Sequence, residues 1–441
     1  MKTLLRNFDI LTTSKLSPIK GGSLLVNRGR IVEVLEPRSP VPEEGIERVI
    51  EGRGRLLIPG FVNSHTHLGM TLFRGFAEDL NLEDWLEKWI WPAEENLTPE
   101  EVYWGSALAA VESIKAGVTT VADMYFHMDQ TAQALEDSGL RALISYGIIA
   151  PKMSSGGEEE VRTGLDLVDD WDGAAEGRIN VALSPHAPYT CGDDVLTELS
   201  KAAGEKGVPI HTHLSETRDE VDRSVENFGL SPVARVEKLG LLENEVMAAH
   251  CVHVDEKDIE ILANYRVLSL HNPTSNAKLA SGIAPVAKMS TEGVDVGLAT
   301  DGAASNNDLG MIKEMKLAAM LSKVSNGDPE SLPVEAVYRM AVAEDVDGFG
   351  LGKLGKIEEG FKADLIAVDR NSSRWIPEYD PFSNLVYSGK SADVDMVMID
   401  GKVVMEEGKV TTIDEAEVIE KVREIATKYG RIRQSKLSNT T

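Results

Sequence analysis

Histidine and acidic residues follow short apolar runs at several distant points of the chain. His65 and His67 stand two residues apart after the run IPGFVNS, so their side chains point to the same side of a strand. His213 and His250 end the runs PIHTH and VMAAH, and Asp301 ends the run VGLATD. Imidazole nitrogens with one carboxylate form a donor set that zinc hydrolases use around an open position for water. The pattern therefore predicts a hydrolytic metal centre.

A further acidic residue beside this set is predicted to carry protons. Glu216 follows His213 by three residues, which places it in a loop just past the strand, leaning over the pocket. Asp301 is costly to bury after an apolar run unless it is paired or bound to a metal ion. The remaining histidines near strand ends are predicted as follows: His211 as a hydrogen-bonded core residue, His127 and His253 as structural residues, and His271 either as a structural residue or as one that orients groups at the rim.

The elements that must position these side chains alternate regularly through the middle of the chain. Eight short apolar runs, separated by helix-like stretches, begin at Leu57, Val118, Ala142, Ile179, Pro209, Val246, Arg266 and Val294. Strand and helix repeated eight times indicate a parallel (β/α)8 barrel, whose strands direct their carboxyl ends to one catalytic face. A doubly wound open sheet is the alternative, which the lack of a G-x-G-x-x-G motif after the first strand weakens.

Both ends of the chain look rich in β-strands. Turn signals at residues 27–29 and at Asp400 and Gly401 separate strand-like runs, which is typical of hairpins. We expect the two ends to build one small β-sandwich, with a charged helix over residues 414–430. The chain then divides into an N-terminal sandwich part at 1–57, a metal-dependent barrel at 58–365, and a C-terminal sandwich part with the terminal helix at 366–441.

Composition excludes several classes of partner. The formal net charge of -27 would repel phosphate backbones and anionic lipids, so we expect no nucleic-acid or membrane binding. No apolar run approaches the roughly 20 residues of a membrane span, and Arg6 and Asp9 interrupt any signal-peptide core, which predicts a cytoplasmic protein. Cys191 and Cys251 are too few for a disulfide framework and are expected to be buried thiols.

Further motifs carry a resemblance to a known family. They are PGFVNSHTH, FRGFAEDL with the downstream WIWPAEENL, DMYFH, SPHAPYTC, HTHLSET, AAHCVH, HNPTSNAKLASGIAPV, ATDGAASNN and GKIEEGFKADLIAVD. The chain resembles the amidohydrolase superfamily, and most closely the 5-methylthioadenosine/S-adenosylhomocysteine deaminases. These motifs run across the whole expected barrel and return to the small sandwich.

The resemblance implies one divalent metal ion, zinc in the first place and iron or manganese as alternatives. It assigns the ligands to His65, His67, His213 and Asp301. The expected fourth strand, INVALSPH, contains no lysine to bridge a second metal, which fits a mononuclear site. The remaining implied roles are His250 toward the attacking water, His186 toward the purine ring, and Glu94, or its neighbour Glu95, toward the ribose hydroxyls. Trp85 and Trp89, one helical turn apart, are expected either to form an apolar pocket wall or to pack in the core.

The implied reaction is the hydrolytic removal of ammonia from the adenine ring of a small purine nucleoside. Asp301 would accept the proton of the water, His250 would hold its oxygen, and Glu216 would protonate the ring nitrogen N1. Where S-adenosylhomocysteine deaminases carry arginines for the substrate carboxylate, this chain has Tyr146 and Glu158, and Lys152 or Arg162 would have to substitute. Adenosine, 5′-deoxyadenosine, 5-methylthioadenosine and S-adenosylhomocysteine therefore all stay open as substrates.

Two alternatives remain. One is an amidohydrolase acting on a different ring, such as a triazine chlorohydrolase or a guanine or cytosine deaminase. It would share the metal set but not the pairing of His186 with Glu94. The other is a non-catalytic scaffold, which would usually have lost ligands that this chain keeps. We also expect the protein to form a homo-oligomer.

Overall fold

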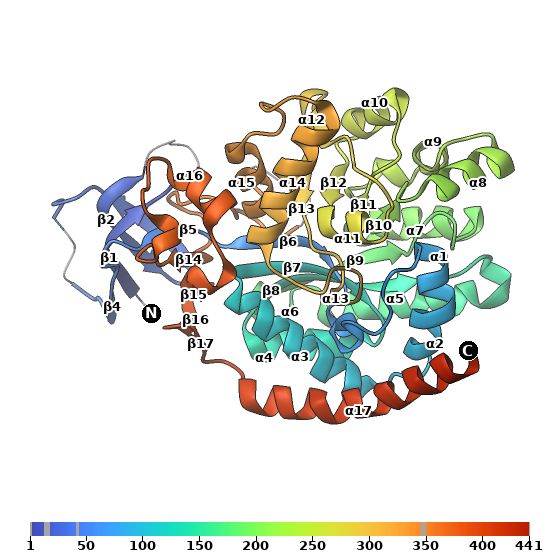
Figure 1. Ribbon diagram of the computed structural model, residues 1–441, viewed down its shortest axis with the longest axis horizontal. Helices are drawn as coiled ribbons and strands as arrows, with labels where there is room; N and C mark the ends of the chain where they lie inside the picture. The colour runs from blue at the N-terminus through green and yellow to red at the C-terminus, as the bar shows by residue number, and fades with distance from the viewer. Residues whose placement is uncertain (1, 13–17, 41–43, 345–349, 441) are drawn as a thin grey trace.

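A parallel barrel forms the larger part of the protein. The computed structural model describes residues 2–12, 18–40, 44–344 and 350–440. Within them, eight strands form one sheet in sequence order, each parallel to the next (Figure 1). The strands are β6 (Phe61–Thr66), β7 (Val118–Tyr125), β8 (Arg141–Ile148), β9 (Ile179–Pro185), β10 (Ile210–Leu214), β11 (Val246–His250), β12 (Leu268–His271) and β13 (Val296–Leu298). The predicted barrel is confirmed.

The first and last strands of this sheet meet through polar groups. The backbone N–H of Asp301 donates to the carbonyl oxygen of His65 over 3.0 Å. The Asn63 amide group donates to the Thr300 hydroxyl at 2.7 Å and accepts from the Thr300 backbone N–H at 3.0 Å. These bonds bring the ends of β6 and β13 together, and with them two of the predicted metal ligands.

Helices surround the strands and begin with sequence signals that stabilise a first turn. In α3, Thr98 accepts from the Glu101 N–H while the Glu101 carboxylate accepts from the Thr98 N–H, with Pro99 as the first helical residue. The helices around the strands include α3 (Pro99–Lys115), α4 (Met128–Ser138), α5 (Glu158–Trp171), α7 (Asp193–Lys206), α8 (Arg218–Phe228), α10 (Glu256–Asn264), α11 (Pro273–Lys278), α13 (Ala303–Asn306), α14 (Met311–Asn326) and α15 (Val334–Val342).

Both ends of the chain join in one small β domain beside the barrel, as predicted (Figure 1). Its described strands form a mixed sheet in the order β17-β16-β15-β14-β5-β1-β2-β3, with β4 also paired to β1. They are β1 (Lys2–Ile10), β2 (Ile19–Asn27), β3 (Arg30–Leu35), β4 (Arg48–Glu51), β5 (Leu56–Pro59), β14 (Leu365–Val368), β15 (Val394–Ile399), β16 (Lys402–Glu406) and β17 (Lys409–Val410). Leu24 of β2 and Met398 of β15 belong to one apolar core although they are distant in the sheet order, so the sheet folds back on itself.

Both predicted hairpins are present, with two-residue turns. Arg28 and Gly29 join β2 to β3, and Asp400 and Gly401 join β15 to β16. All four turn residues have positive φ angles, between 48° and 73°. Such left-handed turns match the twist of the strands that they connect.

The terminal helix is longer than predicted and lies along the barrel. Helix α17 (Glu415–Thr440) runs beside α3 from the small domain toward the segment that precedes α3 (Figure 1). The Lys428 ammonium lies 2.8 Å from the Glu101 carboxylate, and the Arg433 guanidinium donates to the Phe76 carbonyl oxygen at 2.7 Å. Although residues 366–441 were expected to belong with the sandwich, these contacts attach the helix to the barrel.

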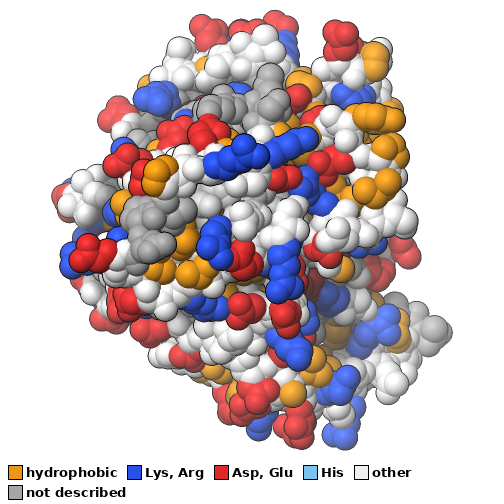
Figure 2. Space-filling model, turned by 90° about the vertical axis from the view of Figure 1, so that its left-hand side faces the viewer, with side chains coloured by type: hydrophobic (Ala, Val, Ile, Leu, Met, Phe, Trp, Pro, Cys, Tyr) orange, Lys and Arg blue, Asp and Glu red, His pale blue; other side chains and the backbone are white. Residues whose placement is uncertain are grey.

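The surface carries charges of both signs despite the negative net charge. Acidic and basic side chains are interspersed on the face that the small domain presents in Figure 2. Among the described residues, no helix has both the length and the apolar character needed to cross a membrane.

Candidate metal centre and active site

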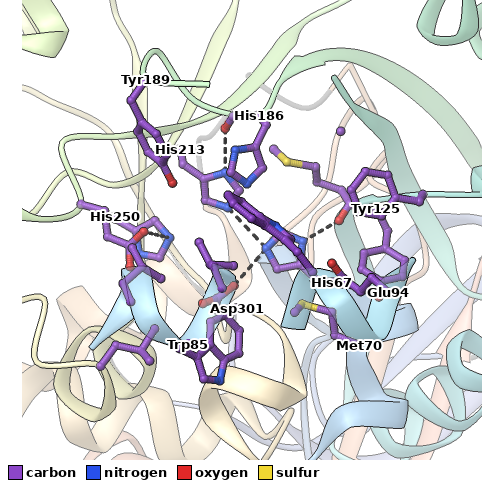
Figure 3. A pocket seen from close by; sticks show the side chains of 18 residues that line it. His67, Met70, Trp85, Glu94, Tyr125, His186, Tyr189, His213, His250 and Asp301 are labelled. Carbon is purple, nitrogen blue, oxygen red and sulfur yellow. Dashed lines mark hydrogen bonds and ion pairs between the residues drawn. The ribbon is translucent and has the colours of Figure 1, made fainter. Parts of the chain in front are cut away.

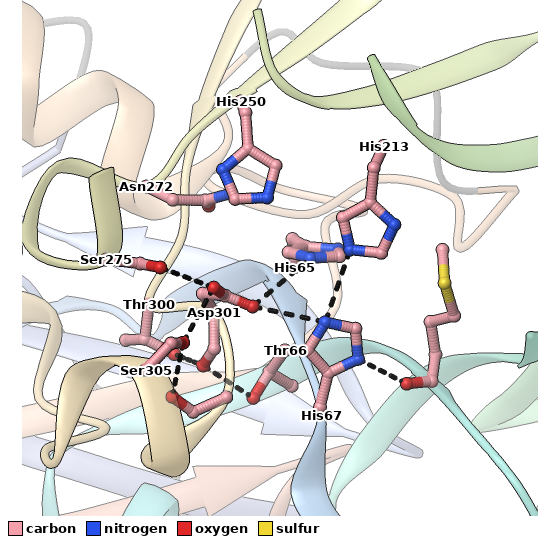
Figure 4. Close-up of polar contacts among 12 residues, drawn as sticks. His65, Thr66, His67, His213, His250, Asn272, Ser275, Thr300, Asp301 and Ser305 are labelled. Carbon is pink, nitrogen blue, oxygen red and sulfur yellow. Dashed lines mark hydrogen bonds and ion pairs between the residues drawn. The ribbon is translucent and has the colours of Figure 1, made fainter. Parts of the chain in front are cut away.

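Three strand ends, those of β6, β10 and β13, bring the predicted metal ligands together. The Nε2 atoms of His67 and His213 are 3.3 Å apart, and Asp301 Oδ1 lies 3.1 Å from His67 Nε2 and 3.5 Å from His65 Nε2. These side chains are largely buried. Donor atoms of His65, His67 and His213 lie within 4.8 Å of one another, as do those of His65, His250 and Asp301. Segments far apart in sequence thus converge on one small space (Figure 4).

Each imidazole of the set is oriented through its other ring nitrogen. The Nδ1 atoms of His67 and His213 lie 2.5 Å and 2.7 Å from the carbonyl oxygens of Met124 and His186, so both nitrogens donate. His65 Nδ1 contacts Nε2 of His211, one layer deeper, at 2.8 Å. These bonds leave the Nε2 lone pairs free to face the shared space, as metal-binding histidines require.

The residues present fit a divalent metal ion. His65 Nε2 is fully buried and has no hydrogen-bond partner in the described part of the chain, a costly arrangement unless the lone pair coordinates a cation. Three imidazoles and one carboxylate suit zinc in particular. His65, His67, His213 and Asp301 could therefore hold such an ion.

Asp301 is held by hydroxyl groups on the side away from the imidazoles. Its Oδ2 accepts from Ser275 at 2.6 Å and from Ser305 at 2.7 Å, which leaves Oδ1 toward the histidines (Figure 4). Burial raises the pKa of Asp301, but the neighbouring imidazoles outweigh this effect and hold its pKa well below the usual value. The side chain is therefore a fixed carboxylate.

Glu216 and His250 face each other beside the ligand set. His250 Nε2 lies 3.7 Å from Glu216 Oε2, and His250 Nδ1 lies 2.8 Å from the Asn276 amide oxygen. The Ser281 hydroxyl donates to Glu216 Oε1 at 3.1 Å. Burial raises the pKa of Glu216, because an ionised carboxylate loses hydration in this position. A carboxyl group with a raised pKa is suited to exchange protons near neutral pH.

The backbone is strained at the same strand ends. Ser215, His250 and Asp301 have φ angles of 52°, 75° and 63°, in the left-handed region that non-glycine residues rarely adopt. Such conformations cost about 1–3 kcal/mol each and persist only where the surroundings enforce them. Their concentration around one space is typical of an active site.

A pocket opens directly above the ligand set. Its lining side chains surround about 610 Å³ of space between atoms, part of it open to solvent. Figure 3 shows Glu94 and His186 on the wall of this pocket together with His67, His213 and Asp301. The remaining lining residues used below are Trp85, Trp91, Tyr125, Phe126, Glu216 and His250.

The structure shows which of the adjacent residues Glu94 and Glu95 lines the pocket, a choice that the sequence left open. Tyr125 donates to Glu94 Oε1 at 2.7 Å, whereas Glu95 is exposed and does not line this pocket. Burial raises the pKa of Glu94 to about 7, against the lowering effect of the Tyr125 hydrogen bond. Of these two neighbours, Glu94 is thus the one that a ligand in the pocket would meet.

Other sequence candidates also have definite places. Trp85 is buried and lines the pocket, whereas Trp89 packs against Phe76 with ring centres 6.1 Å apart. Burial lowers the pKa of His186 to about 3, so its imidazole is neutral. Three of the histidines outside the pocket lining have other places: His127 precedes α4, His253 Nε2 contacts the Ser281 carbonyl oxygen at 2.7 Å, and His271 is buried.

Residues that support the site were not singled out from the sequence. Asp123 lies two residues before the end of β7, is fully buried, and accepts from the Leu68 N–H at 2.7 Å, which fixes the chain directly after His67. Ser275 and Ser305 hold Asp301, and Tyr125 holds Glu94. Their place in the sequence is the one feature that could have identified them, because each of these residues lies near the end of a strand or in the turn or short helix that follows it.

The fold and the site define a (β/α)8-barrel protein with a candidate mononuclear metal centre at the carboxyl ends of its strands. The chain belongs to the amidohydrolase family, whose sequence profile matches residues 56–404. The match thus covers the whole barrel and its connections to the small domain.

Similar proteins are known by name. The chain is 44% identical over 427 residues to a 5-methylthioadenosine/S-adenosylhomocysteine deaminase of Carboxydothermus hydrogenoformans, covering 97% of each chain. It is 44% identical to a 5′-deoxyadenosine deaminase of Methanosarcina acetivorans, covering 96% of this chain and 97% of the relative. The crystal structure of an adenosine deaminase from Xanthomonas campestris with bound zinc superposes with a TM-score of 0.91 at 32% identity, covering 97% of this chain and 98% of that one.

Proposed function

We propose that the protein is a metal-dependent hydrolase that removes ammonia from the adenine ring of a nucleoside. One arrangement carries the proposal: Glu94 and His186 face the same pocket as the cluster of His65, His67, His213 and Asp301. Deamination of adenine nucleosides in the similar proteins supports it, as their names state. The substrate is thus a small molecule, and the metal is proposed to be zinc, as in the Xanthomonas campestris structure.

Asp301 would begin the chemistry as a proton acceptor. When bound, a divalent cation supplies a water whose pKa is lowered from 15.7 toward roughly 7. Asp301 keeps one oxygen toward this space while Ser275 and Ser305 fix the other, so it can take a proton and pass it to the leaving amine. His250, whose Nδ1 donates to Asn276, presents Nε2 as an acceptor that aligns the attacking oxygen.

Glu216 would act on the purine ring itself. Its raised pKa and its place on the pocket wall suit a carboxyl group that protonates N1 and thereby makes C6 electrophilic. Proton transfer of this kind contributes about 10²- to 10⁴-fold to a rate. Water addition at C6, followed by loss of ammonia, leaves an inosine-type product.

Glu94 and His186 would select the nucleoside. One carboxylate can accept hydrogen bonds from two vicinal hydroxyl groups, which matches a ribose. His186 is a neutral imidazole whose Nδ1 lies 3.1 Å from the Thr190 hydroxyl, and its other nitrogen is available to a ring nitrogen. A hydrolase for a triazine or a free base would have no use for a ribose-binding carboxylate.

Ammonia release from a panel of nucleosides tests the proposal. Protein loaded with one equivalent of zinc would be incubated with adenosine, 5′-deoxyadenosine, 5-methylthioadenosine and S-adenosylhomocysteine, with guanine and cytosine as controls. We expect ammonia and the inosine analogue from at least one adenine nucleoside and none from guanine or cytosine. Full zinc occupancy without ammonia from any nucleoside would refute the proposal, and purification without stoichiometric metal would favour a scaffold.

A further inference from the structure

A second cavity adjoins the candidate active site. Trp91, Glu94 and Phe126 line both spaces. The second space amounts to about 1730 Å³, part of it open to solvent, and extends over α5. If Glu94 holds the ribose hydroxyls, as the proposed function states, the 5′ carbon of the nucleoside starts at the border of the two cavities. The outer cavity is then the space for the 5′-substituent.

Carboxylates dominate the lining of this outer cavity. They belong to Glu94, Glu95, Asp129, Asp166 and Asp170. Asp166 and Asp170 stand four residues apart on α5, so they lie on one face of that helix. Neither these two aspartates nor Glu95 form an ion pair within the described part of the chain. Their charge is therefore available to a ligand.

Positive side chains are missing from the same lining. Among its described residues there is no lysine or arginine, and one histidine, His127. Lys152 and Arg162, the residues that would have to replace the missing arginines, lie outside the lining. A ligand carboxylate would meet five acidic groups there without a cation to pair with, which costs binding energy through repulsion and incomplete pairing.

Aromatic rings complete the cavity. Trp91, Phe126 and Tyr146 line it, and the ring centres of Phe126 and Tyr146 are 6.2 Å apart. Aromatic faces attract ammonium groups through the negative potential above the ring. Carboxylates and aromatic faces around one space are the surroundings that suit a cationic substituent.

We propose that the outer cavity selects adenine nucleosides whose 5′-substituent ends in a protonated amine and discriminates against those that end in a carboxylate. The proposal rests on the proposed function, because it takes Glu94 as the contact for the ribose. It narrows the substrate class of that site: S-adenosylhomocysteine carries a carboxylate and is disfavoured, whereas neutral 5′ groups are accepted without a charge preference.

Three matched nucleosides test the proposal. They are 5′-thioalkyl adenosines of equal chain length that end in an amine, a methyl group or a carboxylate. At low ionic strength we expect kcat/KM to fall in that order, with the amine above the carboxylate by about tenfold or more. The ratio should shrink as salt is added, because the charges face solvent. Equal kcat/KM values for the amine and the carboxylate, or a preference for the carboxylate, would overturn the proposal.

A double variant locates the effect. Asp166→Asn with Asp170→Asn should lower the amine-to-carboxylate ratio by about threefold or more and leave the methyl compound unchanged. Asp295→Asn, an exposed carboxylate before β13 at the opposite end of the barrel, is the matched control and should keep the ratio. An unchanged ratio in the double variant would contradict the assignment.

These experiments distinguish a failure of the charge selection from a failure of the proposed deamination. If the protein deaminates the methyl compound but has equal kcat/KM values for the amine and the carboxylate compounds, the charge selection is wrong and the proposed deamination stands. If zinc-loaded protein deaminates none of the three compounds and no adenosine either, the proposed function fails and this inference fails with it.

Discussion

Glu216 is the residue whose role depends most on its carboxyl group. The Glu216→Gln variant keeps the size and the contact with Ser281 but cannot carry a proton. We predict that kcat falls by about 10²- to 10⁴-fold while the metal content stays at one equivalent. Steady-state kinetics with metal analysis would check this, with the exposed Glu226→Gln on α8 as a matched control. Near-normal turnover of Glu216→Gln would remove its assigned role.

We predict a different effect for a substitution of Glu94, because this residue would contact the ribose and not the adenine ring. Glu94→Gln should lower kcat/KM for a nucleoside by about tenfold or more, the value of a hydrogen bond to a charged group, and leave any turnover of free adenine unchanged. Kinetics with adenosine and adenine side by side would measure this. Exposed Glu100→Gln serves as the control. An equal loss on both substrates would argue against a ribose contact.

At the residue scale, sequence reasoning is most direct where position along a strand decides the direction of a side chain. His65, His67, His213 and Asp301 were predicted to converge from their places at strand ends, and the structure brings them together. Their supporting partners could not be predicted in the same way. Ser275 and His211 reach their partners from other strands or loops, across 26 and 146 residues of sequence, so only the folded barrel makes these contacts visible.

At the scale of elements, the barrel and the small domain are joined by a buried ion pair. Arg141, at the start of β8, contacts Asp364, just before β14, through Nε–Oδ2 and Nη2–Oδ1 distances of 2.6 Å and 3.1 Å. Both side chains are almost fully buried, at 1% and 5% exposure. Loss of Asp364 would leave the buried guanidinium with the longer contact between its Nη2 and Asp400 Oδ1, at 3.5 Å.

We predict that Asp364→Asn destabilises the protein by about 3 kcal/mol while kcat and KM remain near normal. Urea unfolding and thermal unfolding with a parallel activity assay would test this. The exposed pair of Lys402 and Glu176 also links the small domain to the barrel, and Glu176→Gln should leave the unfolding midpoint unchanged. Equal midpoints for wild type and Asp364→Asn would contradict the prediction.

The elements themselves were predictable because their hydrophobic patterns are local. The barrel strands overlap the predicted apolar runs, although the run from Leu57 divides into β5 of the small sheet and β6 of the barrel. Both hairpin turns lie where the glycine turns predict them. The end of α17 was not predicted, because residues beyond Gly430 show only weak apolar periodicity. Contacts of Arg433 with Phe76 and of Lys436 with the Trp89 ring lie in that extension, which is therefore supported by tertiary packing.

At the scale of the whole molecule, the candidate metal centre lies between the ends of β6, β10 and β13. Removing a bound ion would leave His65 Nε2 buried without a hydrogen-bond partner among the described residues. We predict that a chelator abolishes ammonia release and lowers the unfolding temperature, and that zinc restores both. An ion at 1,000 times its Kd contributes about 4 kcal/mol to stability. Asp301→Asn should lose most of this gain, and an unfolding temperature that does not respond to zinc would speak against the site.

The predicted homo-oligomer belongs to the same scale and stays a prediction. The small domain and α17 both lie outside the barrel (Figure 1). Sedimentation equilibrium over a range of concentrations would decide the oligomeric state independently of activity.

Anomalous X-ray diffraction from zinc-loaded crystals would locate the ion. We predict one strong anomalous peak within coordination distance of His65, His67 and His213 Nε2 and of the Asp301 carboxylate, and loss of that peak in His213→Ala. A fully active crystal without a peak at this position, or with its only peak elsewhere, would contradict this prediction.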